Sequence, residues 1–209
     1  MSQIPILKNF YLAGGTGCAL WLNHRISVDL DFFTPKSFHP QNLMNKLVQL
    51  GRFKLEQKSE DTLDGEFNNT RIHFLSYPYP LLERPKNLMT IKDSIFFKTY
   101  LGVIRLKVAG LTDIGCMKID AIATRGRKRD FVDLYFICQR HCPLEKLLLA
   151  FTKKYRATGY NLSHILKSLT YFADAEKDPM PKMLVKANWN TIKDYFLSET
   201  PKVFKSLLK

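Results

Sequence analysis

Two aspartates separated by a single residue, Asp29 and Asp31, are the side chains of this chain best placed to do chemistry. They fall in a run of apolar residues typical of a β-strand, where residues two apart point to the same face. Two carboxylates held so close repel each other unless a cation lies between them. Mg²⁺ or Mn²⁺ is the cation we expect, because such ions take hard oxygen ligands and leave coordination positions for phosphate.

A glycine turn precedes this acidic pair. Gly14, Gly15 and Thr16 are followed by a short helical run, and free backbone N–H groups at the start of a helix bind phosphate. Either feature alone is more often an ordinary turn or a solvated strand end. Together, a glycine turn, a short helix and then paired acids form the layout that a nucleoside triphosphate site needs.

A second charged group lies on two predicted helices farther along the chain, over about 112–125 and 129–140. Thr112 is a suitable N-cap for the first helix, and Gly126 is suited to the position after its last turn. Lys118 and Arg125 are seven residues apart and therefore share one face of this helix.

Two acids, Asp130 and Asp133, are three residues apart near the start of the second predicted helix. A structural explanation is open for each: Lys118 as a solvated lysine, and Asp130 as an acid favoured by the helix dipole. We expect a functional role for Asp130. For Asp133 we expect an ion pair with Arg125 or Arg129 that joins the two helices.

In these segments the sequence resembles the AbiEii/AbiGii abortive-infection toxin family, in the nucleotidyltransferase (DNA polymerase β-like) superfamily. The resemblance covers residues 8–140 and is carried by residues 14–16, 24–33, 118–125 and 129–135. It implies a metal-dependent transfer of a nucleotide from an NTP to an acceptor hydroxyl. It also implies that the protein is the toxin of a type IV-like toxin–antitoxin or abortive-infection system, and that a cognate antitoxin is its partner.

The resemblance also implies roles for individual residues. Asp29 and Asp31 would hold the metal, and Lys118 would contact the nucleotide. Asp130 would be a second essential acid that orients Lys118, binds a second metal or acts as a base. The residues expected to bind the nucleotide are Gly14, Gly15, Thr16, Ser27 and Arg125.

One feature of the wider superfamily is missing. Many of its enzymes carry a third carboxylate on a later strand, and the best candidate strand here is residues 70–77. That strand has no acidic residue, only the basic residues Arg71 and His73.

The chain is strongly basic, with a net charge of +13 over 209 residues. An excess of this size favours a polyanionic partner, and nucleic acid is the first candidate. RNA, with tRNA as a reasonable acceptor, is the expected substrate, although a solvated basic turn would explain part of the charge. The residues expected to bind nucleic acid are Arg127, Lys128, Arg129, Lys153 and Lys154.

Composition excludes several other classes. No apolar run approaches the ~20 residues of a membrane span, and the first residues lack a signal-peptide core, so a cytoplasmic protein is expected. The four cysteines contain no C-x-x-C pair. Cys138, His141 and Cys142 cluster but supply only three zinc ligands, so we expect reduced, mostly buried thiols.

The predicted fold class is α+β, a mixed-sheet nucleotidyltransferase core over 1–110 followed by a helical domain over 111–209, with the active site in the cleft between them. Strands are expected at 9–14, 28–34, 52–60, 66–77, 94–98 and 103–107, with Leu63-Asp64-Gly65 as a turn. Helices are expected at 16–24, 39–50, 112–125, 129–140, 143–156, 161–174 and 189–208.

The main functional prediction is a Mg²⁺-dependent nucleotidyltransferase acting on RNA. The alternatives are a non-catalytic module on the same fold that binds nucleic acid or an antitoxin, and a transferase with a small-molecule or protein acceptor. Asp29 and Asp31 discriminate between catalysis and binding, because a binder of polyanions would be helped by losing them.

Overall fold

The computed structural model describes residues 5–87 and 106–207 of the chain. The fold is α+β, as predicted, and it divides into two compact units. The first unit comprises Met1–Leu20 with Ser27–Gly110, and the second comprises Trp21–Ile26 with Leu111–Lys209.

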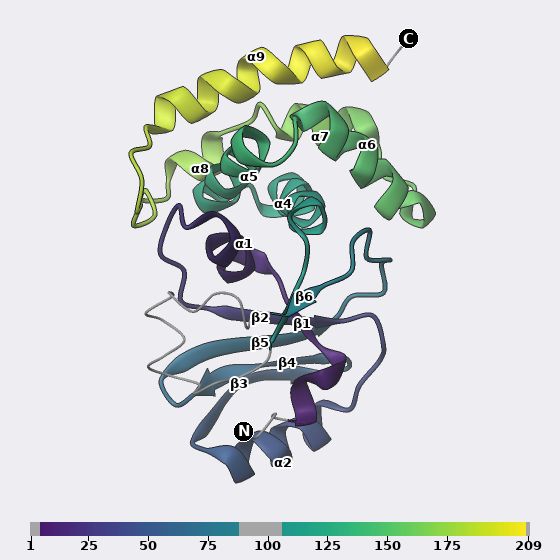
Figure 1. Ribbon diagram of the computed structural model, residues 1–209, viewed down its shortest axis with the longest axis vertical. Coiled ribbons are helices and arrows are strands. Elements are labelled where there is room, and N and C mark those ends of the chain that lie inside the picture. Colours follow the sequence, from purple (N-terminus) through teal and green to yellow (C-terminus); the bar gives the residue numbers. More distant parts are fainter. Residues whose placement is uncertain (1–4, 88–105, 208–209) are drawn as a thin grey trace. The chain divides into compact units, whose positions relative to one another are not determined.

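A mixed seven-stranded sheet in the order β3-β4-β5-β2-β1-β7-β6 is the frame of the first unit (Figure 1). β2 pairs in parallel with β5 and antiparallel with β1, so it lies at the centre of the sheet. The strands are β1 (Tyr11–Leu12), β2 (Leu30–Thr34), β3 (Phe53–Ser59), β4 (Thr62–Phe67), β5 (Thr70–Ser76), β6 (Lys86–Asn87) and β7 (Lys107–Val108).

Buried and part-exposed residues alternate along the central strands, so the buried residues share one face of the sheet. That face is apolar. Helix α2 (Pro40–Leu50) covers this face and buries Leu43 and Leu47 (Figure 1). The buried strand residues are Leu30, Phe32, Leu63, Ile72 and Phe74. The alternate residues of β2, β4 and β5 are polar in most positions, so the site residues are carried by the opposite face.

The predicted turn at Leu63-Asp64-Gly65 is wrong, because these residues lie inside β4. The turns are instead at Asp61 and at Asn68-Asn69, which all adopt positive φ. Two successive residues with positive φ suit a tight hairpin. Gly65 is a glycine for a different reason: a side chain there would meet the ring of Phe53 and the backbone of β3.

The strand predicted over 66–77 is also wrong in part, because the turn at Asn68-Asn69 divides it: residues 66–67 end β4 and residues 70–76 form β5. The remaining elements of the first unit lie near their predicted positions. Helix α1 (Gly14–Leu22) occupies the segment expected at 16–24, and a 3₁₀ turn, η1 (Pro5–Asn9), precedes β1. The predicted strand at 94–98 and most of the one at 103–107 lie outside the described residues.

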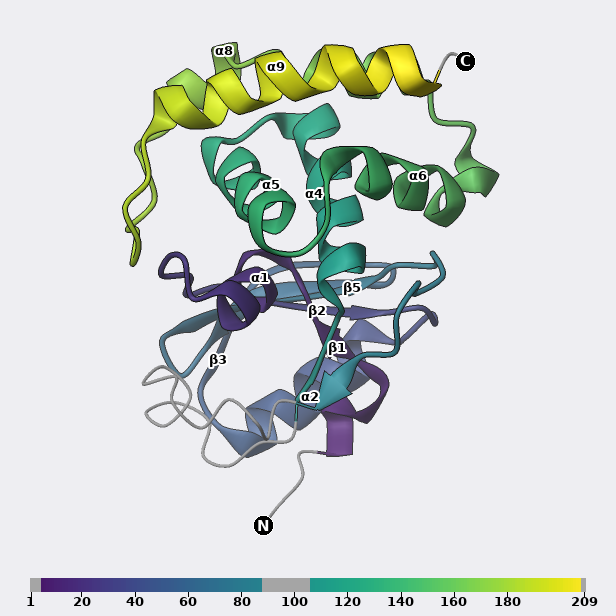
Figure 2. The ribbon, with the colours of Figure 1, turned by 45° about the horizontal axis from the view of Figure 1, so that its top comes forward.

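The second unit is helical. Its elements are α4 (Leu111–Arg125), α5 (Lys128–Arg140), α6 (Leu144–Lys154), η3 (Arg156–Thr158), α7 (Leu162–Ser168), α8 (Ala173–Glu176) and α9 (Trp189–Leu207). Helix α9 packs against α5 and α6 (Figure 2). Phe131 of α5 is buried at the centre of an aromatic cluster with Phe172, Trp189 and Phe196.

Two details of this unit differ from the prediction. The helix expected over 161–174 is broken into α7 and α8. Thr112 lies within the first turn of α4, where its hydroxyl lies 2.9 Å from Nε2 of His141. Gly126 ends α4 with φ +54°, as predicted from its position. Among the described residues, no helix is both long and apolar enough to span a membrane.

Candidate active site

The glycine turn lies directly against the carboxylate of Asp31. The amide of Ala13 donates to the carbonyl of Asp31 at 3.0 Å, and the chain then turns at Gly14 with φ +61°. A side chain at Gly14 would collide with the Asp31 carboxylate. Gly14 is therefore required both by its backbone conformation and by the close approach of the acid.

The start of α1 also holds the segment that leads into β2. Thr16 is buried, and its hydroxyl donates to the backbone carbonyl of Asp29. The hydroxyls of Thr16 and Ser27 lie 3.0 Å apart. The two predicted nucleotide-binding hydroxyls are thus brought together, and in this structure they fix the backbone that presents Asp29.

Asp29 immediately precedes β2, and Asp31 is its second residue. Leu30 and Phe32 are buried, as expected of residues on the opposite face, whereas Val28 is 53% exposed and does not join them. Asp29 also lines a surface hollow of about 470 Å³. Its other walls are Val28, Glu56, Glu66, Asn69, Thr70 and Arg71.

The second unit contains a buried charge cluster centred on Asp133. Arg25 grips this carboxylate at two points, with Nε 2.6 Å from Oδ1 and Nη2 2.8 Å from Oδ2. His24 Nε2 lies 2.8 Å from Oδ1, and Lys118 Nζ lies 2.6 Å from Oδ2. Burial disfavours the charged form of Asp133, but the charge of Lys118 and the bonds from Arg25 and His24 lower its pKa well below the usual range.

Buried Asp130 links this cluster to Arg125, which reaches solvent. Lys118 Nζ donates to Asp130 at 2.8 Å, and the guanidinium of Arg125 bonds the same carboxylate at 3.0 and 3.3 Å. Lys118 is only 4% exposed, whereas the side chain of Arg125 is 53% exposed. Burial opposes charge on Lys118, but the charges of Asp130 and Asp133 outweigh it and raise the pKa of Lys118.

The cluster corrects one prediction and adds two residues. Asp133 pairs with Arg25, His24 and Lys118, while Arg125, one of its expected partners, bonds Asp130. His24 and Arg25 were missed as site residues because 108 or more positions separate them from Asp133. No spacing rule links residues so far apart in sequence.

The predicted nucleic-acid residues divide into exposed and buried ones. Arg129 and Lys153 are exposed. Arg127 is half exposed and pairs with Asp178 at 2.7 Å. Lys128 is buried: its ammonium group donates to the backbone carbonyl of Asp178 at 2.6 Å and lies over the ring of Trp189.

Lys154 is 2% exposed, and its ammonium group lies 2.7 Å from Asp113 inside the helical unit. Lys154 and Lys128 thus differ from the prediction of surface contacts, because each is drawn into its unit by an acceptor on another helix or loop. Among the tyrosines of this part of the chain, Tyr155 is buried, whereas Tyr160 and Tyr171 are exposed.

All four cysteines are free thiols, as predicted. Burial raises the pKa of both Cys116 and Cys138 to about 12, which keeps these thiols protonated at neutral pH. His141, the third member of the considered zinc cluster, contacts Thr112.

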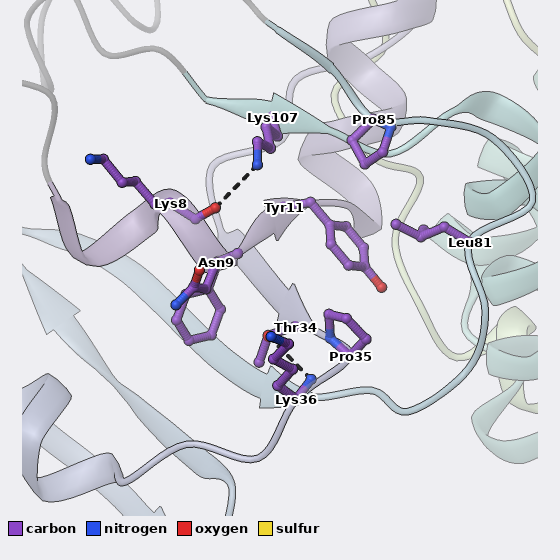
Figure 3. A pocket seen from close by; sticks show the side chains of 10 residues that line it. Lys8, Asn9, Tyr11, Thr34, Pro35, Lys36, Leu81, Pro85 and Lys107 are labelled. Atoms are coloured by element: carbon purple, nitrogen blue, oxygen red, sulfur yellow. Dashed lines mark hydrogen bonds between the residues drawn. The ribbon is translucent and has the colours of Figure 1, made fainter.

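A further pocket, of about 230 Å³, lies at the ends of β1 and β2 away from the aspartates (Figure 3). Lys8, Lys36 and Lys107 contribute to its lining, and Lys107 Nζ donates to the carbonyl of Lys8 at 3.2 Å. Figure 3 shows the ammonium group of Lys8 pointing away from the pocket. The three lysines do not converge, so this pocket is not arranged as an anion site.

A family model described as the nucleotidyl transferase AbiEii toxin of type IV toxin–antitoxin systems matches residues 1–209. The chain belongs to the AbiEii nucleotidyltransferase toxin family. The resemblance in the sequence is thereby confirmed, and with it the prediction that the protein is a nucleotidyltransferase. Membership in a toxin–antitoxin family implies an antitoxin partner.

Individual proteins are similar to this chain in sequence or in fold. The chain is 36% identical over 197 residues to an uncharacterized protein of Aquifex aeolicus, with 93% of this chain and 87% of that protein covered. The fold is similar to that of MenT4, a nucleotidyltransferase toxin of Mycobacterium tuberculosis, with a TM-score of 0.60 and 16% identity. That match covers 92% of this chain and 75% of MenT4.

Proposed function

We propose that this AbiEii-family protein transfers a nucleotide from an NTP to a hydroxyl of RNA, with tRNA as the first acceptor to test, and that it does so in the cytoplasm. The observation that carries the proposal is the seating of the Asp31 carboxylate on the Gly14 turn, next to Asp29. This arrangement joins a turn suited to phosphate binding to two acids at the start of the central strand of a mixed sheet.

A divalent cation fits this arrangement. Asp29 and Asp31 offer hard carboxylate oxygens, and Gly14 has no side chain that would crowd the Asp31 carboxylate. Mg²⁺ or Mn²⁺, when bound, would neutralise charge on the phosphates during transfer. In this proposal the backbone amides of Gly14 and Gly15 bind phosphate oxygens, and the hydroxyls of Thr16 and Ser27 hold the backbone of Asp29 in place.

Lys118, Arg125 and Asp130 are proposed to contribute to nucleotide binding. Three cations, Arg25, Lys118 and Arg125, surround the carboxylates of Asp130 and Asp133. An anionic phosphate would form strong, charge-assisted hydrogen bonds with such cations. Arg125 is the member that reaches solvent, and Asp130 positions it together with Lys118.

The acceptor is inferred from charge. A net charge of +13 attracts polyanions, and Arg127, Arg129 and Lys153 remain at the surface. A second acceptor class, a small cationic molecule, is favoured by a different observation: Glu56 and Glu66 line the hollow beside Asp29. The mixed lining, which includes Arg71, makes this the weaker candidate.

The test is incubation with each radiolabelled NTP, Mg²⁺ and total tRNA, with a parallel reaction on a cationic aminoglycoside. An Asp29→Asn/Asp31→Asn variant serves as the inactive control, and exposed Asp194→Asn as the matched carboxylate control. We expect label on RNA from the unmodified protein and Asp194→Asn, and none from the double variant.

Label on the aminoglycoside alone would replace the RNA acceptor with the small-molecule one. Label on the protein itself would point to self-modification. Absence of label anywhere, with tRNA bound equally by all variants, would contradict transfer to RNA and favour a binding role.

A further inference from the structure

A row of polar side chains crosses the sheet from Asp31 to the neighbouring strands. In the parallel pairing of β2 with β5, Asp31 lies opposite His73. In the antiparallel pairing of β5 with β4, His73 lies opposite Asp64. Residues paired in register point to the same face, so these three side chains are neighbours on the face that carries the proposed catalytic acids.

His73 and Asp64 are in direct contact. Nδ1 of His73 lies 3.0 Å from Oδ1 of Asp64, and their side chains are 23% and 19% exposed. That Oδ1 atom is buried, and apart from this 3.0 Å contact, which is not aligned as a hydrogen bond, it has no polar partner among the described residues. A buried carboxylate oxygen without a proton donor is costly, so the proton of a neutral His73 belongs on Nδ1.

This assignment leaves Nε2 of His73 with a lone pair. Nε2 has no polar partner within the part of the chain that the structure describes. An imidazole oriented by a carboxylate at one nitrogen and open at the other can accept a proton. The remaining exposure of the side chain allows a substrate hydroxyl to reach it.

The charges around this row belong to the same face. The hydrogen bond from Arg71 to Glu56 is the main cause of the raised pKa of Arg71, and the charges of Asp29 and Asp64 add to it. Arg71 precedes His73 by two residues on β5 and therefore shares its face. The pair of His73 and Asp64, called the dyad below, thus lies among the polar groups that surround Asp29 and Asp31.

We propose that His73 is the general base for the acceptor hydroxyl and that Asp64 is the residue that positions it; this inference rests on the proposed function. The O–H bond of the acceptor breaks and its proton passes to Nε2 of His73. The oxygen bonds to the α-phosphorus, and the bond from that phosphorus to the bridging oxygen breaks. Pyrophosphate leaves with the electron pair, and the proton then passes from the imidazolium to water.

The proposal accounts for the missing third acid on β5. The position next to Asp31 on that strand is His73, and the carboxylate is found one strand farther, at Asp64 of β4. In this proposal the imidazole of His73 takes the place on β5 where many other enzymes of the superfamily carry the third carboxylate.

The experiment measures the rate of label transfer to total tRNA and the KM for the NTP in His73→Gln, Asp64→Asn and the double variant. His39→Gln, an exposed histidine of the same unit, is the matched control. Because general-base catalysis contributes about 10²–10⁴-fold, we expect His73→Gln to lower kcat by about 100-fold or more with KM little changed. Asp64→Asn should lower kcat less, and it should cost nothing further once His73 is replaced.

Calorimetric NTP binding in the presence of Mg²⁺ shows whether each variant retains a folded site. Equal rates for His73→Gln and His39→Gln would overturn the role of His73 while leaving the proposed function intact. A full additional loss from Asp64→Asn in the His73→Gln background would overturn the dyad. An unmodified protein that transfers no label would overturn the proposed function, and the dyad with it.

Discussion

Single residues set the geometry of both charged groups. Gly14 lets the Asp31 carboxylate lie against the backbone of the turn, and Asp133 accepts bonds from three side chains. In the first case the absence of a side chain is the essential property. For Asp133 the essential property is its negative charge, because without it the buried cations Arg25 and Lys118 would lose a partner.

We expect Gly14→Ala to lower activity by about 100-fold, because it displaces Asp31 and because misplacement of a reacting group by about 1 Å can cost that much. The positive φ adds roughly 1–2 kcal/mol of destabilisation. Gly159→Ala is the matched control, since Gly159 has φ +63° and open space around it. Transfer assays and urea unfolding of both variants separate the collision with Asp31, which only Gly14→Ala causes, from the backbone strain that both variants share. Equal activities of the two variants would contradict the contact between Gly14 and Asp31.

Asp133→Asn should destabilise the protein by about 3–5 kcal/mol, because it leaves buried cations uncompensated. Asp174→Asn, which breaks an exposed pair with Lys177, should cost less than about 1 kcal/mol. The comparison is made by urea unfolding at neutral pH. A cost for Asp133→Asn as small as that of the control would mean that the cluster does not hold the unit together.

The same cluster predicts how stability depends on pH. The folded protein lowers the pKa of Asp133 and of Asp130, so the unfolded chain takes up these protons first as the pH falls. Their stabilisation is fully present above the unfolded carboxyl pKa of about 3.9 and is lost below it. We expect the free energy of unfolding to fall below about pH 4, and to fall less steeply in Asp133→Asn.

At the scale of elements, helices and strands decide which of two similar residues is available. Lys153 and Lys154 are adjacent on α6, but the helix turns Lys153 to solvent and Lys154 towards Asp113 of α4. On β5 the same alternation separates buried Ile72 and Phe74 from His73.

We therefore expect opposite effects from two neighbouring substitutions. Lys154→Ala should destabilise the helical unit by about 3–5 kcal/mol, since Asp113 loses a buried partner. Lys153→Ala should change stability by less than about 0.5 kcal/mol but weaken tRNA binding. Thermal unfolding and filter binding measure the two effects, and equal melting temperatures would contradict the burial of Lys154.

At the scale of the whole molecule, the net charge of +13 is the property that bears on the acceptor. Binding of RNA by neutralised phosphates releases counterions, so affinity depends on salt. With about three phosphate contacts, we expect the affinity for tRNA to fall roughly 20- to 40-fold between 50 and 200 mM salt. Asp29→Asn/Asp31→Asn should bind at least as tightly, and a salt-independent affinity would contradict an electrostatic RNA interface.

The sequence determined those features that depend on neighbours along the chain. The D-x-D pair and the glycine turn are local patterns. Helices α2, α4, α5, α6 and α9 follow from apolar residues repeating at helical spacing. The positive φ of Gly126 follows from its place after the last turn of α4. The family, too, could be identified from motifs whose spacing is kept within short segments.

The tertiary structure alone decided the features that depend on residues far apart in sequence. The pairing of Arg25 with Asp133 spans 108 positions, and the burial of Lys128 depends on Asp178 and Trp189. The row from Asp31 through His73 to Asp64 depends on the register of three strands. Strand pairing and burial arise from contacts between distant segments, and no local pattern of residue types encodes them.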